Sequence, residues 1–123
     1  MASTKANVVV WDDVTLTAGA GADSTVSDVQ NWTDGYGGVA LLKLTNGATG
    51  PTVASAVQLE ASGDGVNFYG LGGPISGGVA NNGITDLVID VPIGVMYLRA
   101  TAGSNTDQNV TVRLEVSEVT EVR

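Results

Sequence analysis

The stretch "VASAVQLEASGDGVNFYGL", residues 53–71, decides the fold class of this chain. Between residues 57 and 61 apolar side chains alternate with Gln and Glu, the period-two pattern of a strand with one buried face. The pair Asp64-Gly65 follows, and glycine supplies the positive φ that hairpin turns require. We therefore predict a strand over 53–62, a bend at Asp64-Gly65 and a second strand over 66–71.

A functional interpretation of the same turn has Asp64 and Asn67 holding a cation or a sugar hydroxyl. The turn preference of the Asp-Gly pair and the spacing of the two flanking strands favour the bend.

The rest of the chain follows the same period. Adjacent Asp12 and Asp13 interrupt the alternation of the first strand and predict a bulge or bend there. No window carries a capped 3.6-residue stripe, so we expect no long helix. Short strands separated by turn signals predict an all-β fold, a single β-sandwich of about eight antiparallel strands in a jelly-roll or immunoglobulin-like Greek key. The further strands are predicted at 7–17, 25–32, 39–46, 84–91, 95–102 and 109–119.

One domain is expected from 123 residues. Residues 1–7 are small and polar and are interpreted as a flexible N-terminal arm, with the sandwich spanning 8–123. Placing one face of each strand in the interior predicts a set of mostly buried side chains. These are Leu42, Leu44, Val57, Leu59, Leu87, Ile89, Met96, Leu98, Val112 and Leu114.

Composition excludes several function classes. The chain has no cysteine and no histidine, which excludes disulfides, thiol nucleophiles and thiolate-bound zinc. A formal net charge of −8 argues against nucleic acid and against an anionic membrane surface as partners. The N-terminus lacks the apolar core of a signal peptide, and no apolar run is long enough to span a membrane. We expect a protein made in the cytoplasm.

Several short patterns resemble functional sites. Asn105, Asp107 and Asn109 have the spacing that begins a calcium loop, but the glycine and glutamate such a loop needs are replaced by valines, which favours a polar hairpin tip. Serine and threonine lack a histidine base.

Single carboxylates are available for a hydrolase at Asp34, Asp86 or Asp90, yet nothing in the sequence brings a pair together. The scattered aromatic residues are interpreted as core or sheet-edge residues rather than as a sugar platform. We therefore predict no enzyme, no catalytic, cofactor-binding or metal residues, and no cofactor.

Two segments resemble small β-sandwich structural proteins of tailed bacteriophages, most closely capsid decoration (cement) proteins. They are "LLKLTNGATGPTVASAVQLEASGDGVNFY" (41–69) and "DVPIGVMYLRATAGSNTDQNVTVRLEVSEV" (90–119), together about half of the chain. The resemblance implies a virion protein on the capsid surface, made in the host cytoplasm, with the major capsid protein as partner and homotrimers as the self-associated form. The turn at Asp64 is also similar to one in discoidin-like carbohydrate-binding sandwiches, so a carbohydrate-binding or receptor-adhesion module on a phage head or tail is the alternative.

Overall fold

The computed structural model describes residues 3–122, and within that range the chain forms ten β-strands and no helix. Six strands are long and four contain two residues each. A membrane-spanning helix is accordingly absent from this range. The strands are β1 (Ser3–Leu16), β2 (Thr25–Val26), β3 (Gln30–Asn31), β4 (Gly38–Asn46), β5 (Ala56–Ser62), β6 (Tyr69–Gly70), β7 (Ile75–Ser76), β8 (Ile84–Val91), β9 (Tyr97–Gly103) and β10 (Val110–Val122).

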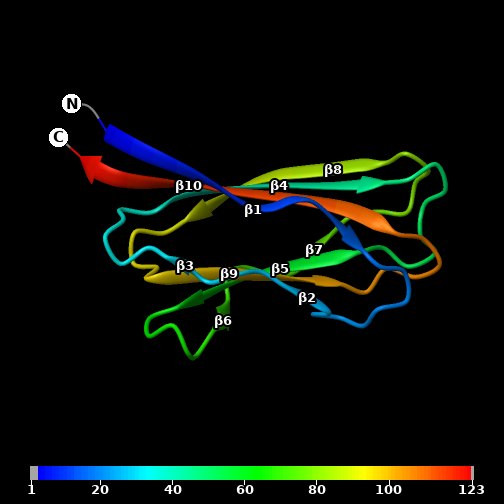
Figure 1. Cartoon of the computed structure of the whole chain (residues 1–123), viewed down its shortest axis with the longest axis horizontal. Helices are drawn as coiled ribbons and strands as arrows, with labels where there is room; N and C mark the ends of the chain where they lie inside the picture. The colour runs from blue at the N-terminus through cyan, green and yellow to red at the C-terminus, as the bar shows by residue number, and fades with distance from the viewer. Residues whose placement is uncertain (1–2, 123) are drawn as a thin grey trace.

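The strands build two antiparallel sheets that face each other, which confirms the predicted β-sandwich (Figure 1). One sheet has four strands in the order β1-β10-β4-β8. The second has six, in the order β2-β9-β5-β6, with β3 paired to β9 and β7 paired to β5. The connections from β4 to β5, from β8 to β9 and from β9 to β10 each cross from one sheet to the other.

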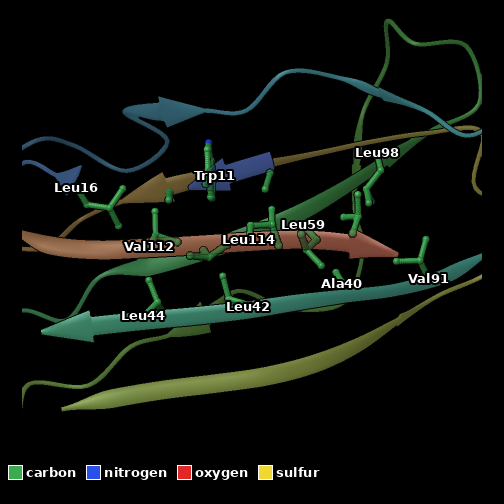
Figure 2. Packing of buried hydrophobic residues seen from close by; sticks show 14 of the residues in the cluster. Trp11, Leu16, Ala40, Leu42, Leu44, Leu59, Val91, Leu98, Val112 and Leu114 are labelled. Atoms are coloured by element: carbon green, nitrogen blue, oxygen red, sulfur yellow. The ribbon is translucent and has the colours of Figure 1, made fainter. Parts of the chain in front are cut away.

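The core lies between the two sheets and is built from one face of each long strand (Figure 2). Leu42 and Leu44 on β4 meet Val112 and Leu114 on β10 across the register, and Leu59 comes from the opposite sheet. Burying a leucine or valine side chain contributes about 1.5–3 kcal/mol, so this apolar layer is the main stabilising term. Seven of the ten predicted core residues are buried: Leu42, Leu44, Val57, Leu59, Leu98, Val112 and Leu114.

Two predicted core residues are exposed, and each has a local cause. Leu87 faces the interior side of β8 opposite Leu42, but β8 is an edge strand and 44% of the leucine remains exposed. Met96 is also 44% exposed, because it precedes the start of β9 and the strand period does not apply to it. The neighbouring Val95 packs against the core in its place. Ile89, the remaining predicted core residue, is partly buried.

The first strand contains the predicted irregularity. Its register with β10 shifts between Val9 and Trp11 and again between Trp11 and Val14, and Asp13 has φ of 49°. These shifts turn Trp11 into the core, while Val8 stays exposed. An extra residue in one strand reverses which side chains face inward beyond it, so strict alternation could not place Trp11.

Strand β1 begins at Ser3, earlier than the predicted start at residue 7. Residues 3–7 of the predicted arm therefore pair with the end of β10, with Ser3 opposite Val122, while residues 1 and 2 lie outside the described residues. Figure 1 shows the start of β1 and the end of β10 side by side, extending together from one end of the sandwich.

Candidate functional site

The turn at Asp64 is a bend whose carboxylate is held by its own loop. Asp64 Oδ1 accepts hydrogen bonds from the backbone N–H of Asn67 at 2.8 Å and of Val66 at 2.9 Å, and Oδ2 accepts one from Asn67 Nδ2 at 2.8 Å. Ser62 Oγ donates a further bond at 3.0 Å. The Asn67 and Val66 amides stabilise the charged form, so the pKa of Asp64 lies well below its usual range.

This geometry confirms the bend and modifies the predicted hairpin. Gly65 has φ of 77°, the conformation that favours glycine. Strand β5 pairs antiparallel with β6, as a hairpin requires, but β6 begins at Tyr69 rather than at Val66. The residues between β5 and β6 form a loop. In this loop the backbone N–H groups of Val66 and Asn67 bond to the Asp64 carboxylate instead of to a neighbouring strand, so the carboxylate stabilises the loop.

The side chains of Asn105, Asp107 and Asn109 bond to different partners. Asn105 is fully buried, and its Nδ2 donates to the carbonyl oxygens of Leu16 at 3.0 Å and Gln108 at 2.8 Å. Asp107 accepts from the hydroxyl of Thr52, and Asn109 Oδ1 accepts from the backbone N–H of Ala18 at 2.8 Å. The segment joins β9 to β10, which lie in different sheets, so the predicted hairpin tip is wrong. It is a polar loop that crosses between the sheets, and its side chains bond to separate parts of the chain.

One hydrogen-bond acceptor of buried Asn105 has no partner. Its Oδ1 and the hydroxyl of Ser55 are buried without a hydrogen-bond partner among the described residues. Both side chains are fully buried, and sequence patterning offers no signal for either, because their burial depends on contacts distant in sequence.

The carboxylates predicted as isolated lie in separate places. Asp86 and Asp90 project from β8 on the outer face of the four-stranded sheet, opposite Lys43 and Val39 of β4. Asp34 lies in the turn before β4, near Glu118. Partial burial, and then the charge of Asp34, raise the pKa of Glu118. Among the described residues no group of three or more acidic side chains is arranged to hold a metal ion.

The aromatic residues divide between core and surface. Trp11 and Trp32 are buried in the core, as the sequence predicted for such residues. Arg99 lies 3.9 Å from the centre of the Phe68 ring and donates from Nε to Glu60 Oε1 at 2.7 Å. Tyr69 is exposed beside a shallow hollow of about 240 Å³, so an aromatic ring is available to solvent at this end of the sandwich.

An open groove of about 560 Å³ lies on the outer face of the four-stranded sheet. Leu41 and Val88 lie opposite each other on β4 and β8 and form its apolar part. Its charged part includes Lys43 and Arg113. Arg113 Nη1 lies 2.6 Å from Asp12 Oδ1, so that guanidinium is already paired.

The outer face continues this mixed pattern toward both edges. Val88 of β8, Leu41 of β4 and Val9 of β1 share one row across the sheet, with Glu115 of β10 between the last two. Val88 and Val9 are exposed. Exposed apolar side chains beside polar and charged ones mark protein-binding surfaces, so the outer face around Val88 and the adjacent edge at β8 form the candidate functional site.

No protein-family model matches the chain, and no curated protein matches it in sequence. Solved structures match it in fold. A chain of infectious bursal disease virus, Gx strain, superimposes with a TM-score of 0.57 at 10% identity, over 94% of this chain and 32% of that one. A Bacillus endospore appendage, from a family of disulfide-linked pili, gives 0.53 at 12% identity over 99% and 93%.

The SPBc2 prophage-derived protein YomS gives a TM-score of 0.52 at 14% identity, over 95% of this chain and 96% of that one. At such identities the likeness concerns the fold alone. The chain has a β-sandwich fold that also occurs in a prophage-derived protein, in a pilus and in a virus chain.

Proposed function

We propose that this chain is a virion structural protein that binds the surface of an assembled bacteriophage head as a decoration or cement protein. The observation that carries the proposal is the outer face and β8 edge of the four-stranded sheet, where Ile84 and Val88 are exposed beside the open groove. Such a surface suits a broad protein partner, and the shared fold with YomS and the bacteriophage-like segments at 41–69 and 90–119 support a phage origin.

The proposed partner is the major capsid protein, and the proposed location is the capsid surface. We place neither nucleic acid nor membrane among the partners, because the chain carries a formal charge of −8. We also propose a binding rather than a catalytic role. The carboxylate of Asp64 is engaged by its own loop, and Asp12 is paired with Arg113.

Self-association, as a homotrimer, belongs to the same proposal. Like-charged protomers repel at long range, and salt screens that repulsion beyond about 8 Å at physiological ionic strength. Association through apolar and backbone groups should therefore weaken as the salt concentration is lowered. Analytical ultracentrifugation at several salt concentrations measures this, and a monomer at every salt concentration would contradict the trimer.

The capsid role is tested on particles produced by the phage or prophage that carries this gene. Purified heads are separated on a density gradient, and the chain is identified by mass spectrometry. We expect it to migrate with heads and to rebind after removal, when the purified protein is added back. Its absence from heads, with no rebinding, would overturn the capsid proposal.

A carbohydrate-binding or receptor-adhesion module is the second candidate, favoured by one observation. Tyr69 is exposed next to a hollow of about 240 Å³ that Ala61 and Val95 also line. Sugar rings stack on exposed aromatic faces, and this hollow could accept one. A glycan array separates the two candidates: binding that is abolished by Tyr69→Ala favours adhesion, whereas an unreactive array favours the capsid surface.

A further inference from the structure

The four-stranded sheet has two edges, formed by β1 and β8, and these edges differ in structure. An edge strand exposes unpaired backbone N–H and C=O groups, which are a template for pairing with another chain. Proteins protect such edges with bulges, lysines, prolines or inward-pointing charges. Comparing the two edges therefore indicates where an added strand would be accepted.

The β1 edge is protected. Its pairing with β10 is interrupted at three places, between Thr4 and Lys5, between Val9 and Trp11, and between Trp11 and Val14. Asp13 adopts a positive φ of 49°, which bends the strand further. Bulges twist an edge away from a flat partner, and the exposed Lys5 adds a charge.

The β8 edge has no bulge, lysine or proline, and its only charged side chains are the outward-facing Asp86 and Asp90. Its register with β4 runs without interruption from Ile84 opposite Thr45 to Val91 opposite Gly38. The strand contains no lysine and no proline, and Pro92 follows its last residue. Within residues 3–122, β8 pairs with β4 and with no other strand. The result is a regular, open edge of eight residues.

The side chains of this edge are apolar and acidic. Ile84 is 61% exposed and Val88 67% exposed, and they alternate with Asp86 and Asp90 on the outer face. Leu87, on the inner side, lacks cover from the opposite sheet. Neither aspartate has a hydrogen bond or an ion pair within the described residues, although Lys43 lies opposite Asp86 on the far side from the open edge.

These charges determine which strand fits. A second copy of β8 would bring four aspartates onto one face of a continuous sheet, and like charges on adjacent strands are destabilising. A strand with cations opposite Asp86 and Asp90, and an apolar residue opposite Val88, would instead form two ion pairs around an apolar pair. The same strand would cover Leu87 from the side.

We infer that the β8 edge accepts an extended segment of a partner protein as a fifth strand, recognised by two basic residues that flank an apolar residue at alternate positions. Main-chain hydrogen bonds supply part of the affinity in such strand addition, and the alternate side chains supply the specificity. The inference rests on the proposed function only for the source of the segment, the capsid protein.

The test is a titration of the full isotope-labelled chain with a synthetic blocked peptide that contains Lys-Thr-Val-Thr-Lys, followed by NMR and by amide hydrogen exchange. We expect shift changes and slowed exchange concentrated in residues 84–91. The matched peptide Glu-Thr-Val-Thr-Glu should give neither. Shift changes located elsewhere, or equal binding of the two peptides, would overturn the inference.

Two variants and one control separate the contribution of charge from that of backbone pairing. The double variant Asp86→Asn with Asp90→Asn retains the shape of both side chains. It should lower the affinity for the basic peptide roughly two- to tenfold, the range for two exposed ion pairs. Asp28→Asn with Asp34→Asn removes the same charge from loops and should leave binding unchanged. Val88→Lys protects the edge and should abolish binding while the fold, checked by the rest of the spectrum, persists.

Binding to purified heads separates this inference from the proposed function. If the wild-type chain binds heads and Val88→Lys does not, the edge is the docking strand. If both bind equally, the inference is wrong and the capsid role stands. If the wild-type chain does not bind heads while the basic peptide still docks on residues 84–91, the capsid role is wrong and the edge remains a strand acceptor for another partner.

Discussion

The side-chain amide of Asn105 donates a hydrogen bond to the carbonyl oxygen of Leu16 at 3.0 Å, joining the end of β1 to the loop that precedes β10. A second bond from the same nitrogen reaches the carbonyl oxygen of Gln108 at 2.8 Å. The side chain is fully buried, so water cannot replace either bond.

Asn105→Ala should therefore lower the free energy of unfolding by about 1–3 kcal/mol, the cost of leaving buried acceptors unpaired. Chemical denaturation monitored by tryptophan fluorescence measures the change. Asn109→Ala is the matched control, because Asn109 is exposed and accepts one bond, from the backbone of Ala18. If both variants lost a similar free energy of unfolding, the burial of Asn105 would not be the cause of the loss.

Leu59→Ala should lower the free energy of unfolding by about 2–5 kcal/mol, since it removes a fully buried side chain from the middle of β5. Leu87→Ala is the matched control on the edge strand, where 44% of the side chain is exposed, and it should cost less. Thermal or urea unfolding compares the two. Equal losses would mean that Leu87 is covered in solution.

Glu118→Gln should raise the melting temperature near neutral pH. Burial and Asp34 raise the pKa of Glu118, so its protonated form is the one the fold favours. The stability linked to this group is complete below its unfolded pKa and is lost as the pH rises through the raised folded pKa. The advantage of the variant should therefore disappear in acid. If Glu118→Gln raised the melting temperature equally at every pH, ionisation of Glu118 would not be the cause.

Asp64→Asn should have the opposite pH profile. The Asn67 and Val66 amides lower the pKa of Asp64, so its contribution to stability is present above the unfolded pKa and is lost as the pH falls through the lowered folded pKa. The variant should melt below the wild-type chain near neutral pH and match it in strong acid. Asp28→Asn, at an exposed loop position, is the control and should melt with the wild-type chain at both.

Period-two patterning predicted the layers of this fold well because each long strand buries one face. The 84–91 strand has the predicted bounds, and Leu42 and Leu44 face the core as expected. Patterning was wrong at Leu87 for a reason that no local signal contains. Its face is the inner one, but exposure depends on strand order, and strand order is set by pairings between distant segments.

The candidate site was less predictable for the same reason. The sequence displays Ile84, Asp86, Val88 and Asp90 in alternation, a pattern that suits an edge strand and a central strand equally. Only the order β1-β10-β4-β8 places that pattern at an open edge. The Asp64 bend, by contrast, was predicted correctly, because its hydrogen bonds join residues within five positions of one another.

The position of β10 between β1 and β4 has a consequence for how the chain folds. Strand β10 follows all other strands in sequence, yet it pairs on both sides, and β1 pairs with nothing else in the described chain. During synthesis β1 must therefore wait for residues about a hundred positions later before it gains a partner. Folds dominated by such distant pairings form in roughly milliseconds to seconds. A nascent chain that stalls before Val110 would have an unpaired β1 and an open side of β4, making it a natural client for chaperones that bind exposed strands.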